Sequence, residues 1–404
     1  MQPWFFAYGL LGLVQNGAAP ILLPLSAGSS GAKGGLIYAA WASAGLLAPL
    51  LGTWADRHGR HLTLVLAGLP LGAAALAAFP FAQGAVAHAG LAFAGGLGVV
   101  AVSIVGTIFI VGRSPAEEWD EQIGVLQAFV SGGQIAGLLL AGACARLPLA
   151  AFFGAAAALL AAWPIAWWFA PREAAPVPRR EVRAPAPVGG EAAASGTQRL
   201  HHASLRGIAS LGWLPQGGLR RFLGVWLLSY TATNAVSVMF PVALTHEFGA
   251  APILPSAAYA AGILLSLPIY RPAGRWEHRG TAWGSARGLL RGGLLSRGLV
   301  LLLLGVLAWL HPSWATWPVL AGFAATQVIW PLLAVSSNTL AVTLAPTDRG
   351  ESVGLLNACT ALGATIGGIA GGLIVTDLGF GALCGVACAC VLAAIVGLRA
   401  MRST

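Results

Sequence analysis

The stretch AGLAFAGGLGVVAVSIVGTIFIVG, residues 89–112, runs for 24 residues without an Asp, Glu, Lys or Arg. The hydrocarbon core of a lipid bilayer is about 30 Å thick, and an α-helix needs about 20 apolar residues to cross it. This stretch therefore predicts a membrane-spanning helix. Eleven further apolar runs bring the expected spans to twelve, at residues 4–25, 34–54, 62–82, 122–143, 149–169, 222–245, 253–270, 289–310, 315–344, 352–376 and 380–398.

The composition of the whole chain also indicates a membrane protein. Of 404 residues, 57% are hydrophobic and 9% are charged, whereas soluble domains carry about 25% charged residues. Disorder is excluded because it requires low hydrophobicity. A disulfide-stabilised secreted protein is excluded because five Cys are few and odd in number. The runs do not alternate between polar and apolar residues as β-barrel strands do, so the predicted fold class is all-α, a polytopic membrane protein with twelve transmembrane helices.

The basic residues indicate how the chain is oriented. If the N-terminus is cytoplasmic, 20 of the 22 Lys and Arg fall in cytoplasmic segments, including those from Arg271 to Arg297, and only Lys33 and Arg146 fall outside. Cytoplasmic loops of membrane proteins carry such an excess of basic residues. We therefore expect both termini in the cytoplasm and the protein in the cell inner membrane. Because the net charge of +9 lies in these loops, it does not predict nucleic-acid binding.

A polar segment divides the spans into two groups of six. Residues 171–219 contain six Pro with scattered Arg and Glu, a composition typical of a linker. Within it, residues 205–213 combine apolar side chains with Arg206. Either the linker is unstructured throughout, or this part forms a short helix at the membrane interface. The predicted domains are a six-helix bundle at 1–170, the cytoplasmic linker at 171–219 and a second six-helix bundle at 220–404.

The two halves also resemble each other in sequence. Residues 124–142 align without gaps to residues 354–372, and six of the 19 pairs are identical. The identical pairs are Gly124/Gly354, Leu126/Leu356, Ala128/Ala358, Gly133/Gly363, Gly137/Gly367 and Gly142/Gly372. The segments hold equal positions in their halves, which favours an internal repeat over a chance match of glycine-rich helices. Two parallel six-helix repeats are a known transporter architecture.

The connection after the second span carries a recognisable motif. Residues 52–61 read GTWADRHGRH. This resembles the loop 2–3 signature of the major facilitator superfamily: Gly, three residues, Asp-Arg, one residue, Gly-Arg and a basic residue, which is His61 here. The resemblance implies transport by alternating access between the two six-helix bundles. The cytoplasmic gate that it predicts comprises Gly52, Asp56, Arg57, Gly59, Arg60 and Arg113.

The residue types in this motif suit a gate. Gly52 would let two helices approach closely, and Asp56 can face the positive N-terminal end of another helix. The resemblance implies that Asp56 helps to lock the cytoplasmic side while the transporter faces outward, with Arg60 or Arg113 as its partner. Anchoring on the cytoplasmic side is an alternative role for the arginines. A degenerate copy of the motif at residues 274–280 offers Glu277.

The fifth span bears part of a glycine pattern that the superfamily's antiporters carry. Gly124, Gly133 and Gly137 fit its spacing, but Leu138 stands where the pattern has Pro. The eleventh span has the same glycine spacing, and a pattern present in both halves is more simply interpreted as close packing of helices through small residues. It therefore gives only slight support for export.

Ionisable side chains are predicted to lie away from the middle of the membrane. All 13 Asp and Glu and all eight His fall in loops or at the ends of spans, and no Arg is expected at mid-depth. Proton relays usually need a buried carboxylate or His, and charged substrates usually need a buried group of opposite charge. We therefore expect an uncharged substrate. If protons are the coupling ion, Asp56 or Glu247 would carry them.

Uncharged polar side chains, in contrast, lie near the middle of several spans. An amide exposed to lipid is costly, so such groups should face the interior. In the superfamily that the motif resembles, spans 1, 4, 7 and 10 line a central cavity, and three of these four carry an amide at mid-depth. A hydrogen bond to a neighbouring helix is the alternative role for any single amide. The predicted cavity residues are Gln15, Asn16, Gln134, Tyr230, Asn234, Tyr259, Gln327 and Trp330.

The predicted function is secondary transport of a small neutral or amphipathic organic compound, with export as the preferred direction. Uptake of a neutral sugar-like solute is one alternative, and a non-transporting assembly factor with a transporter-like fold is another. Catalysis is not expected, because no nucleophile, base and orienting group share one depth. No cofactor or metal is expected, since Cys384, Cys388 and Cys390 lie on an apolar span without His or acid. The expected partners are the substrate, membrane lipids and, as one option, protons; the chain is expected to be a monomer.

Overall fold

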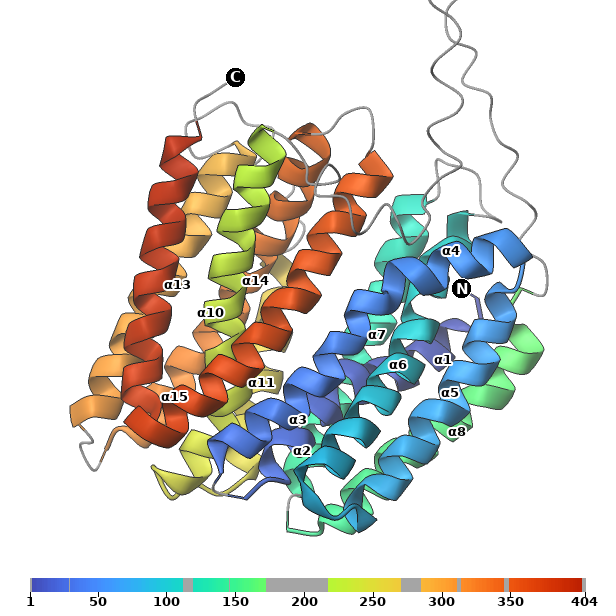
Figure 1. Cartoon of the computed structure of the whole chain (residues 1–404), viewed down its shortest axis with the longest axis horizontal. Coiled ribbons are helices and arrows are strands. Elements are labelled where there is room, and N and C mark those ends of the chain that lie inside the picture. Colours follow the sequence, from blue (N-terminus) through green and yellow to red (C-terminus); the bar gives the residue numbers. More distant parts are fainter. Residues whose placement is uncertain are drawn as a thin grey trace, which may run out of the picture.

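The computed structural model describes residues 2–28, 30–111, 119–144, 146–171, 217–269, 285–310, 314–344 and 349–401. Within these ranges the regular structure is helical throughout, without a strand. Figure 1 shows two groups of helices side by side, one coloured blue to green and the other yellow to red. The first group comes from the N-terminal half of the chain and the second from the C-terminal half.

The N-terminal group begins with a span built of three short pieces, namely α1 (Phe5–Gly12), the π-helix η1 (Leu13–Ala18) and α2 (Ala19–Leu25). The next span joins α3 (Gly31–Ser43), η2 (Ala44–Leu47) and α4 (Ala48–His58). The remaining helices are α5 (His61–Ala78) with η3 (Phe79–Phe81), α6 (Gly84–Val111), α7 (Trp119–Ala143) and α8 (Pro148–Phe169).

The C-terminal group contains α10 (Gly218–His246), α11 (Ile253–Ser266) with η7 (Leu267–Ile269), α13 (Ala286–Leu310), α14 (Thr316–Leu344) and α15 (Arg349–Ala400). Gly379 interrupts α15 with φ 80° and ψ 172°. An unbroken helix of 52 residues would be roughly 80 Å long, far more than one crossing requires. The break at Gly379 therefore separates two spans, close to the position expected between residues 376 and 380.

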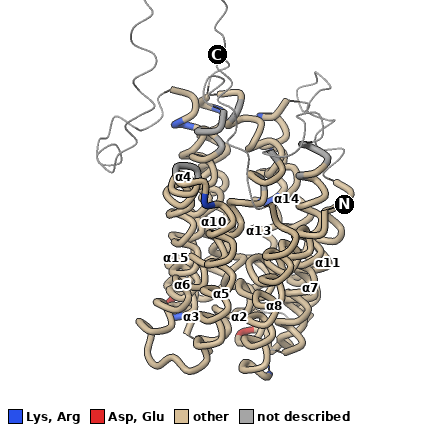
Figure 2. Tube along the Cα trace, turned by 90° about the vertical axis from the view of Figure 1, so that its right-hand side faces the viewer, with Lys and Arg blue, Asp and Glu red and all other residues tan. Residues whose placement is uncertain are grey.

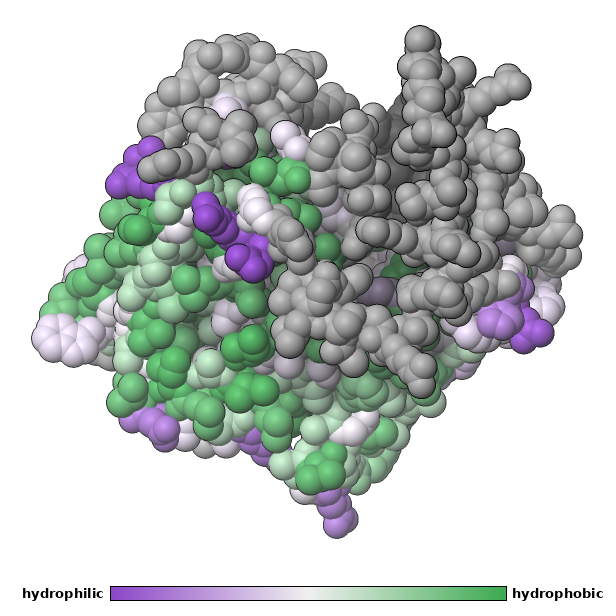
Figure 3. Space-filling model, turned by 45° about the horizontal axis from the view of Figure 1, so that its top comes forward, coloured by the Kyte–Doolittle hydropathy of each residue, from purple (hydrophilic) through white to green (hydrophobic). Residues whose placement is uncertain are grey.

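Ten helices among the described residues are long and apolar enough to cross a membrane, and a shorter apolar helix covers Ile253–Ile269. With the longest of them divided at Gly379, these helices are compatible with the twelve expected spans. Figure 2 shows that most charged residues lie toward the two ends of the helices, while the trace between the ends is largely tan. In Figure 3 green hydrophobic residues cover much of the described side surface, as contact with lipid tails requires.

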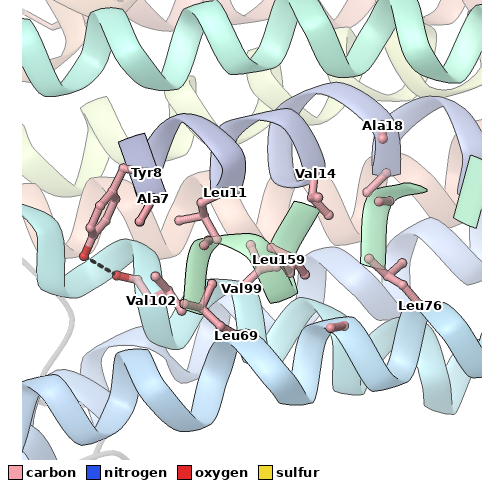
Figure 4. Close-up of a cluster of buried hydrophobic side chains, with 14 of the residues drawn as sticks. Ala7, Tyr8, Leu11, Val14, Ala18, Leu69, Leu76, Val99, Val102 and Leu159 are labelled. Atoms are coloured by element: carbon pink, nitrogen blue, oxygen red, sulfur yellow. Dashed lines mark hydrogen bonds between the residues drawn. The ribbon is translucent and has the colours of Figure 1, made fainter. Parts of the chain in front are cut away.

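Each group of helices has its own buried core. In the N-terminal core, Leu11 and Val14 face Leu69, Val99 and neighbouring apolar side chains (Figure 4). The hydroxyl of Tyr8, also in this core, donates a hydrogen bond of 3.0 Å to the carbonyl oxygen of Val102. The C-terminal core is built around stacked and tilted aromatic rings, including Phe240, Phe323 and Phe380.

Glycines set the closest helix contacts in both halves. A Cβ added to Gly133 or Gly137 on α7 would overlap the backbone of Gly9 or Leu13 in the first span. In the same way, a Cβ on Gly367 of α15 would overlap the backbone of α10 at Thr231. The aligned segments 124–142 and 354–372 thus pack on equivalent helices of their own halves. The glycine spacing serves helix packing, which was the simpler of its two interpretations.

Candidate functional site

A cavity of about 340 Å³ lies between the two halves. It is lined by Asn16, Gln127, Val130, Ser131, Gln134, Tyr230, Thr233, Asn234, Ser237, Tyr259, Ile263, Ser266, Leu267, Arg297, Gln327 and Trp330. Both halves contribute walls, and most of the side chains carry a hydrogen-bonding group. Small-molecule sites are usually concave and mostly apolar, with a few polar groups that fix the orientation of the ligand, so this cavity is more polar than most.

The N-terminal half builds its wall from two elements. Asn16 comes from η1, where the chain makes a π-helix instead of an α-helix. Single-turn π-helical segments inside α-helices are rare and occur frequently at functional sites. The facing helix α7 contributes Gln127, Ser131 and Gln134, whose spacing of four and three residues places them on one helical face.

The C-terminal half repeats this arrangement on α10. Tyr230, Asn234 and Ser237 have the same spacing of four and three residues, so they share one face that looks into the cavity. The ring centroid of Trp330 on α14 lies 6.0 Å from that of Tyr230. An aromatic wall therefore adjoins the polar face of α10.

The structure brings together seven of the eight side chains predicted for the cavity. Asn16, Gln134, Tyr230, Asn234, Tyr259, Gln327 and Trp330 all line it. Gln15 does not, although it is adjacent to Asn16 in the sequence. Consecutive residues of a helix point in different directions, and here the side chain of Asn16, not that of Gln15, is directed into the cavity.

Arg297 corrects the expectation that the cavity has no ionic group. The charge count assigned Arg297 to the cytoplasmic segments, although it falls within the predicted span 289–310. In the structure it is the twelfth residue of the 25-residue helix α13, and its side chain is only 4% exposed. It lines the cavity. Its Nη2 donates a hydrogen bond of 3.0 Å to the carbonyl oxygen of Thr326, and its Cζ lies 5.7 Å from the ring centroid of Trp330.

A periodic signal for Arg297 was present in the sequence. Leu290, Leu294, Leu301 and Leu304 belong to the buried stripe of α13, at successive intervals of four, seven and three residues, and Arg297 fills the gap of seven between Leu294 and Leu301. Arg291, by contrast, is exposed and lies off the stripe. Because the positive-inside count treats every Arg near a helix start alike, it could not separate the two.

Two buried polar atoms of the cavity wall have no hydrogen-bond partner in the described part of the chain, namely Arg297 Nε and Asn234 Oδ1. The other end of the Asn234 amide lies 3.5 Å from the hydroxyl of Tyr38 on α3, in the opposite half. Neither Asp nor Glu occurs among the described residues that line the cavity. The wall therefore presents one positive charge without a negative counterpart.

The two halves touch closely at one end of the molecule. A Cβ on Gly35 of α3 would overlap the carbonyl oxygen of Gly368 on α15, and a Cβ on Gly372 would overlap that of Gly31. Beside these glycines, the backbone N–H of Ala32 donates a hydrogen bond of 2.8 Å to Thr376 Oγ1. Small residues thus let α3 and α15 meet almost backbone to backbone and close this end.

At the opposite end, the structure describes the predicted gate only at Gly52, Gly59 and Arg60. A Cβ on Gly52 of α4 would meet nothing within 4 Å, so no described helix approaches closely at Gly52 in this conformation. Gly59 ends α4 in the left-handed conformation, with φ 63°, which Gly adopts without steric cost. Arg60 is exposed.

Several sequence-based expectations concern residues that the structure leaves undescribed. The side chains of Asp56 and Arg57 and the whole of Arg113 are among them. So are Glu277, with its loop, and the interior of the linker, including residues 205–213.

The remaining candidate groups are engaged in packing or capping. Glu247 Oε1 accepts a hydrogen bond of 3.1 Å from the N–H of Phe380, in the first turn after the break in α15. Cys384 and Cys388 are buried in the C-terminal core. No group of three or more potential metal ligands occurs among the described residues.

Several solved structures of transporters have a similar fold. The nucleoside transporter NupG matches with a TM-score of 0.76 and 11% identity, covering 100% of this chain and 99% of that chain. A POT family transporter in complex with a thioalcohol-conjugated peptide matches with a TM-score of 0.75 and 15% identity, covering 99% and 96%. A bacterial homologue of the iron transporter ferroportin, in an inward-facing state, gives 0.71 and 18%, covering 99% and 97%.

Sequence comparison gives the family. No curated protein matches the chain in sequence. The family model described as Major Facilitator Superfamily matches residues 4–296, which is more than two thirds of the chain. This match agrees with the loop motif at 52–61 and with the transporter folds to which the structure is similar. The chain belongs to the Major Facilitator Superfamily of membrane transporters.

Proposed function

We propose that the chain moves a small organic solute across the membrane by alternating access, with the cavity between its halves as the substrate site. The observation that carries the proposal is the position of that cavity. Its walls come from both halves, so rocking one half against the other would change the side to which it opens. Among the described residues, α3 and α15 meet almost backbone to backbone at one end, whereas Gly52 meets nothing within 4 Å at the other end, and such a cycle requires this asymmetry of a single state.

The proposed orientation rests on the basic residues. With Arg297 moved into the membrane, 19 of the 22 Lys and Arg still fall on the side of the termini, which supports cytoplasmic termini in an inner membrane. In that orientation the contact between Gly35 and Gly368 lies on the outer side. The conformation is then the inward-facing one.

The volume and lining of the cavity also limit the size and the chemical character of the substrate. About 340 Å³ accommodates a compound of drug or metabolite size, and the mixture of amides, hydroxyls and aromatic rings suits an amphipathic molecule. We expected an uncharged substrate because no ionic group was expected in the cavity, and the presence of Arg297 in its wall removes that reason. The proposal includes no direction of transport, because helix packing accounts for the glycine pattern that favoured export.

Cysteine accessibility tests the alternating-access step without a known substrate. In a variant whose five native Cys are replaced, Gln327→Cys places a thiol in the cavity, and a membrane-impermeant maleimide is applied to either side of oriented vesicles. We expect labelling from both sides. Ala400→Cys, at the exposed end of α15, is the control and should react from the cytoplasmic side only.

A second variant separates a transporter from a scaffold factor. Cross-linking Ala32→Cys to Thr376→Cys holds α3 against α15 and should abolish labelling of Gln327→Cys from outside while leaving labelling from inside unchanged. A cavity thiol that reacts from one side only, with or without the cross-link, would contradict alternating access and favour the non-transporting alternative.

A further inference from the structure

We propose that the cavity selects organic anions and that the guanidinium of Arg297 binds the carboxylate-type group of the solute. This inference rests on the proposed function, because it assigns a substrate class to the same cavity. In the proposed binding mode, the aromatic side chains beside Arg297 contact the apolar part of the solute.

The first argument is the charge of Arg297. An Arg side chain stays protonated in proteins, and this one is almost fully buried in the middle of α13. Its described contacts are the carbonyl oxygen of Thr326 and the ring of Trp330, and neither carries a formal charge. Ionisable groups within membrane helices are costly and usually pair with an opposite charge or mark a substrate pathway. The cavity is where the missing negative charge can enter.

The second argument is the geometry of the guanidinium. Thr326 holds one end of it through Nη2, and the hydroxyl of the same Thr326 receives a hydrogen bond of 3.2 Å from Gln327 Nε2. The buried Nε is left without a partner in the described structure. Guanidinium N–H groups bind carboxylates in pairs, through parallel hydrogen bonds. An oxyanion in the cavity would neutralise the charge, and it would also satisfy Nε once a movement of the side chain turns this buried atom toward the cavity.

The third argument is the surface next to the charge. The rings of Trp226, Tyr230 and Trp330 form a cluster with centroid distances of 5.8, 6.0 and 6.2 Å. Tyr230 and Trp330 of this cluster line the cavity. A flat apolar group can lie against these rings while its anionic group meets Arg297, so the solute class is a small amphipathic anion.

Matched probes test the charge preference on the purified full-length protein. Benzoate, benzamide and benzamidine share one shape but are anionic, neutral and cationic, and 2-naphthoate with its amide and amidine forms a larger set. Calorimetric titration should show at least one of the two carboxylates binding about tenfold more tightly than its amide, with the amidine weakest. Equal or tighter binding of both amides, or no measurable binding of either carboxylate, would overturn the proposal.

Variants identify the residue responsible. Arg297→Gln should remove the preference for the carboxylate while changing the affinity for the amide by no more than about threefold. Arg297→Lys should retain part of the carboxylate preference, because Lys keeps the positive charge but cannot form the paired hydrogen bonds of the guanidinium. Arg291→Gln, on the exposed side of the same helix, is the matched control and should keep the full preference. If Arg297→Gln still prefers the carboxylate, another residue must be responsible for the preference, and the proposed anion-binding role of Arg297 is refuted.

The two proposals fail separately. If Arg297 has only a structural role in joining α13 to α14, the charge preference is absent although the cavity thiol is still labelled from both sides. If the chain is a scaffold that binds anions without transporting them, the charge preference is present but labelling occurs from one side only.

Discussion

The guanidinium carbon of Arg297 lies 5.7 Å from the centre of the Trp330 ring, across the boundary between α13 and α14. A cation over the face of Trp is attracted by the negative potential of the ring, by roughly 2 kcal/mol where water is excluded. Trp330 also faces Tyr230 and lines the cavity. One side chain therefore both supports the buried charge and forms part of the surface on which a solute would lie.

Trp330→Leu should weaken the naphthoate and the naphthamide alike. The variant removes the ring that contacts the body of either probe but leaves the guanidinium in place, so the ratio of the two affinities should change far less than in Arg297→Gln. Replacing a stacked aromatic side chain in this way typically costs about 1 kcal/mol. Titration of both probes measures the ratio, and a selective loss of naphthoate binding would show that Trp330 acts only through Arg297.

Membrane helices and cavity amides could be predicted from the sequence because both follow from the cost of placing polar groups in lipid. Long apolar runs must cross, and amides such as Asn234 and Gln327 at mid-depth must face inward. Arg297 was missed because charge counting ignores the helical phase of each residue. The free space beside Gly52 among the described residues could not be predicted, because a sequence does not specify which conformation a structure will show.

Gly133→Ala should destabilise the N-terminal half, whereas Gly132→Ala should not. A Cβ at Gly133 would overlap the carbonyl oxygen of Gly9, while a Cβ at the neighbouring Gly132 would meet nothing within 4 Å. Forcing an extra methyl into a packed contact costs about 1–3 kcal/mol, and Ala in place of Gly at an open helical site gains up to about 1 kcal/mol. Thermal unfolding in detergent should show opposite shifts. Equal melting temperatures would contradict the close contact of α7 with the first span.

Glu247→Gln should leave exchange between inward- and outward-facing states intact, and Glu247→Ala should lower stability. Glu247 Oε1 accepts the N–H of Phe380 where the helix resumes after Gly379, and a hydrogen bond to a charged group contributes roughly 1.5–3 kcal/mol. Gln keeps an acceptor there, but Ala does not. Asp377→Ala, at an exposed acid nearby, is the control for stability. If Glu247→Gln stops two-sided labelling without loss of stability, Glu247 has the role of a proton carrier instead.

Gly35→Leu should shift the protein toward states that open at the end where α3 meets α15. The added side chain cannot fit against the carbonyl oxygen of Gly368, and the halves can relieve the clash by separating there. Labelling of Gln327→Cys from outside should therefore become faster. Gly90→Leu, at a helical glycine with nothing within 4 Å, is the control and should leave the rate unchanged. Unaltered outside labelling in Gly35→Leu would show that this contact does not control access.

Gly52→Val should produce the opposite shift. In this conformation the position is open, so the substitution should not disturb the structure present here. The motif at 52–61 implies a close helix approach at Gly52 when the cytoplasmic side shuts, and a branched side chain would then obstruct the outward-facing state only. Labelling of Gln327→Cys from outside should become slower, with the inside rate and the melting temperature unchanged.

Asp56→Asn should act in the same direction as Gly52→Val, because it removes the charge to which the motif assigns the cytoplasmic lock. The double variant Gly52→Val/Gly35→Leu then provides a test of both ends together. If the two ends alternate as parts of one rigid-body movement, the opposing shifts should largely cancel, as expected for substitutions that bias one two-state equilibrium. If each substitution acts only locally, the double variant should instead show the slow outside labelling of Gly52→Val, and the rocking model would have to be abandoned.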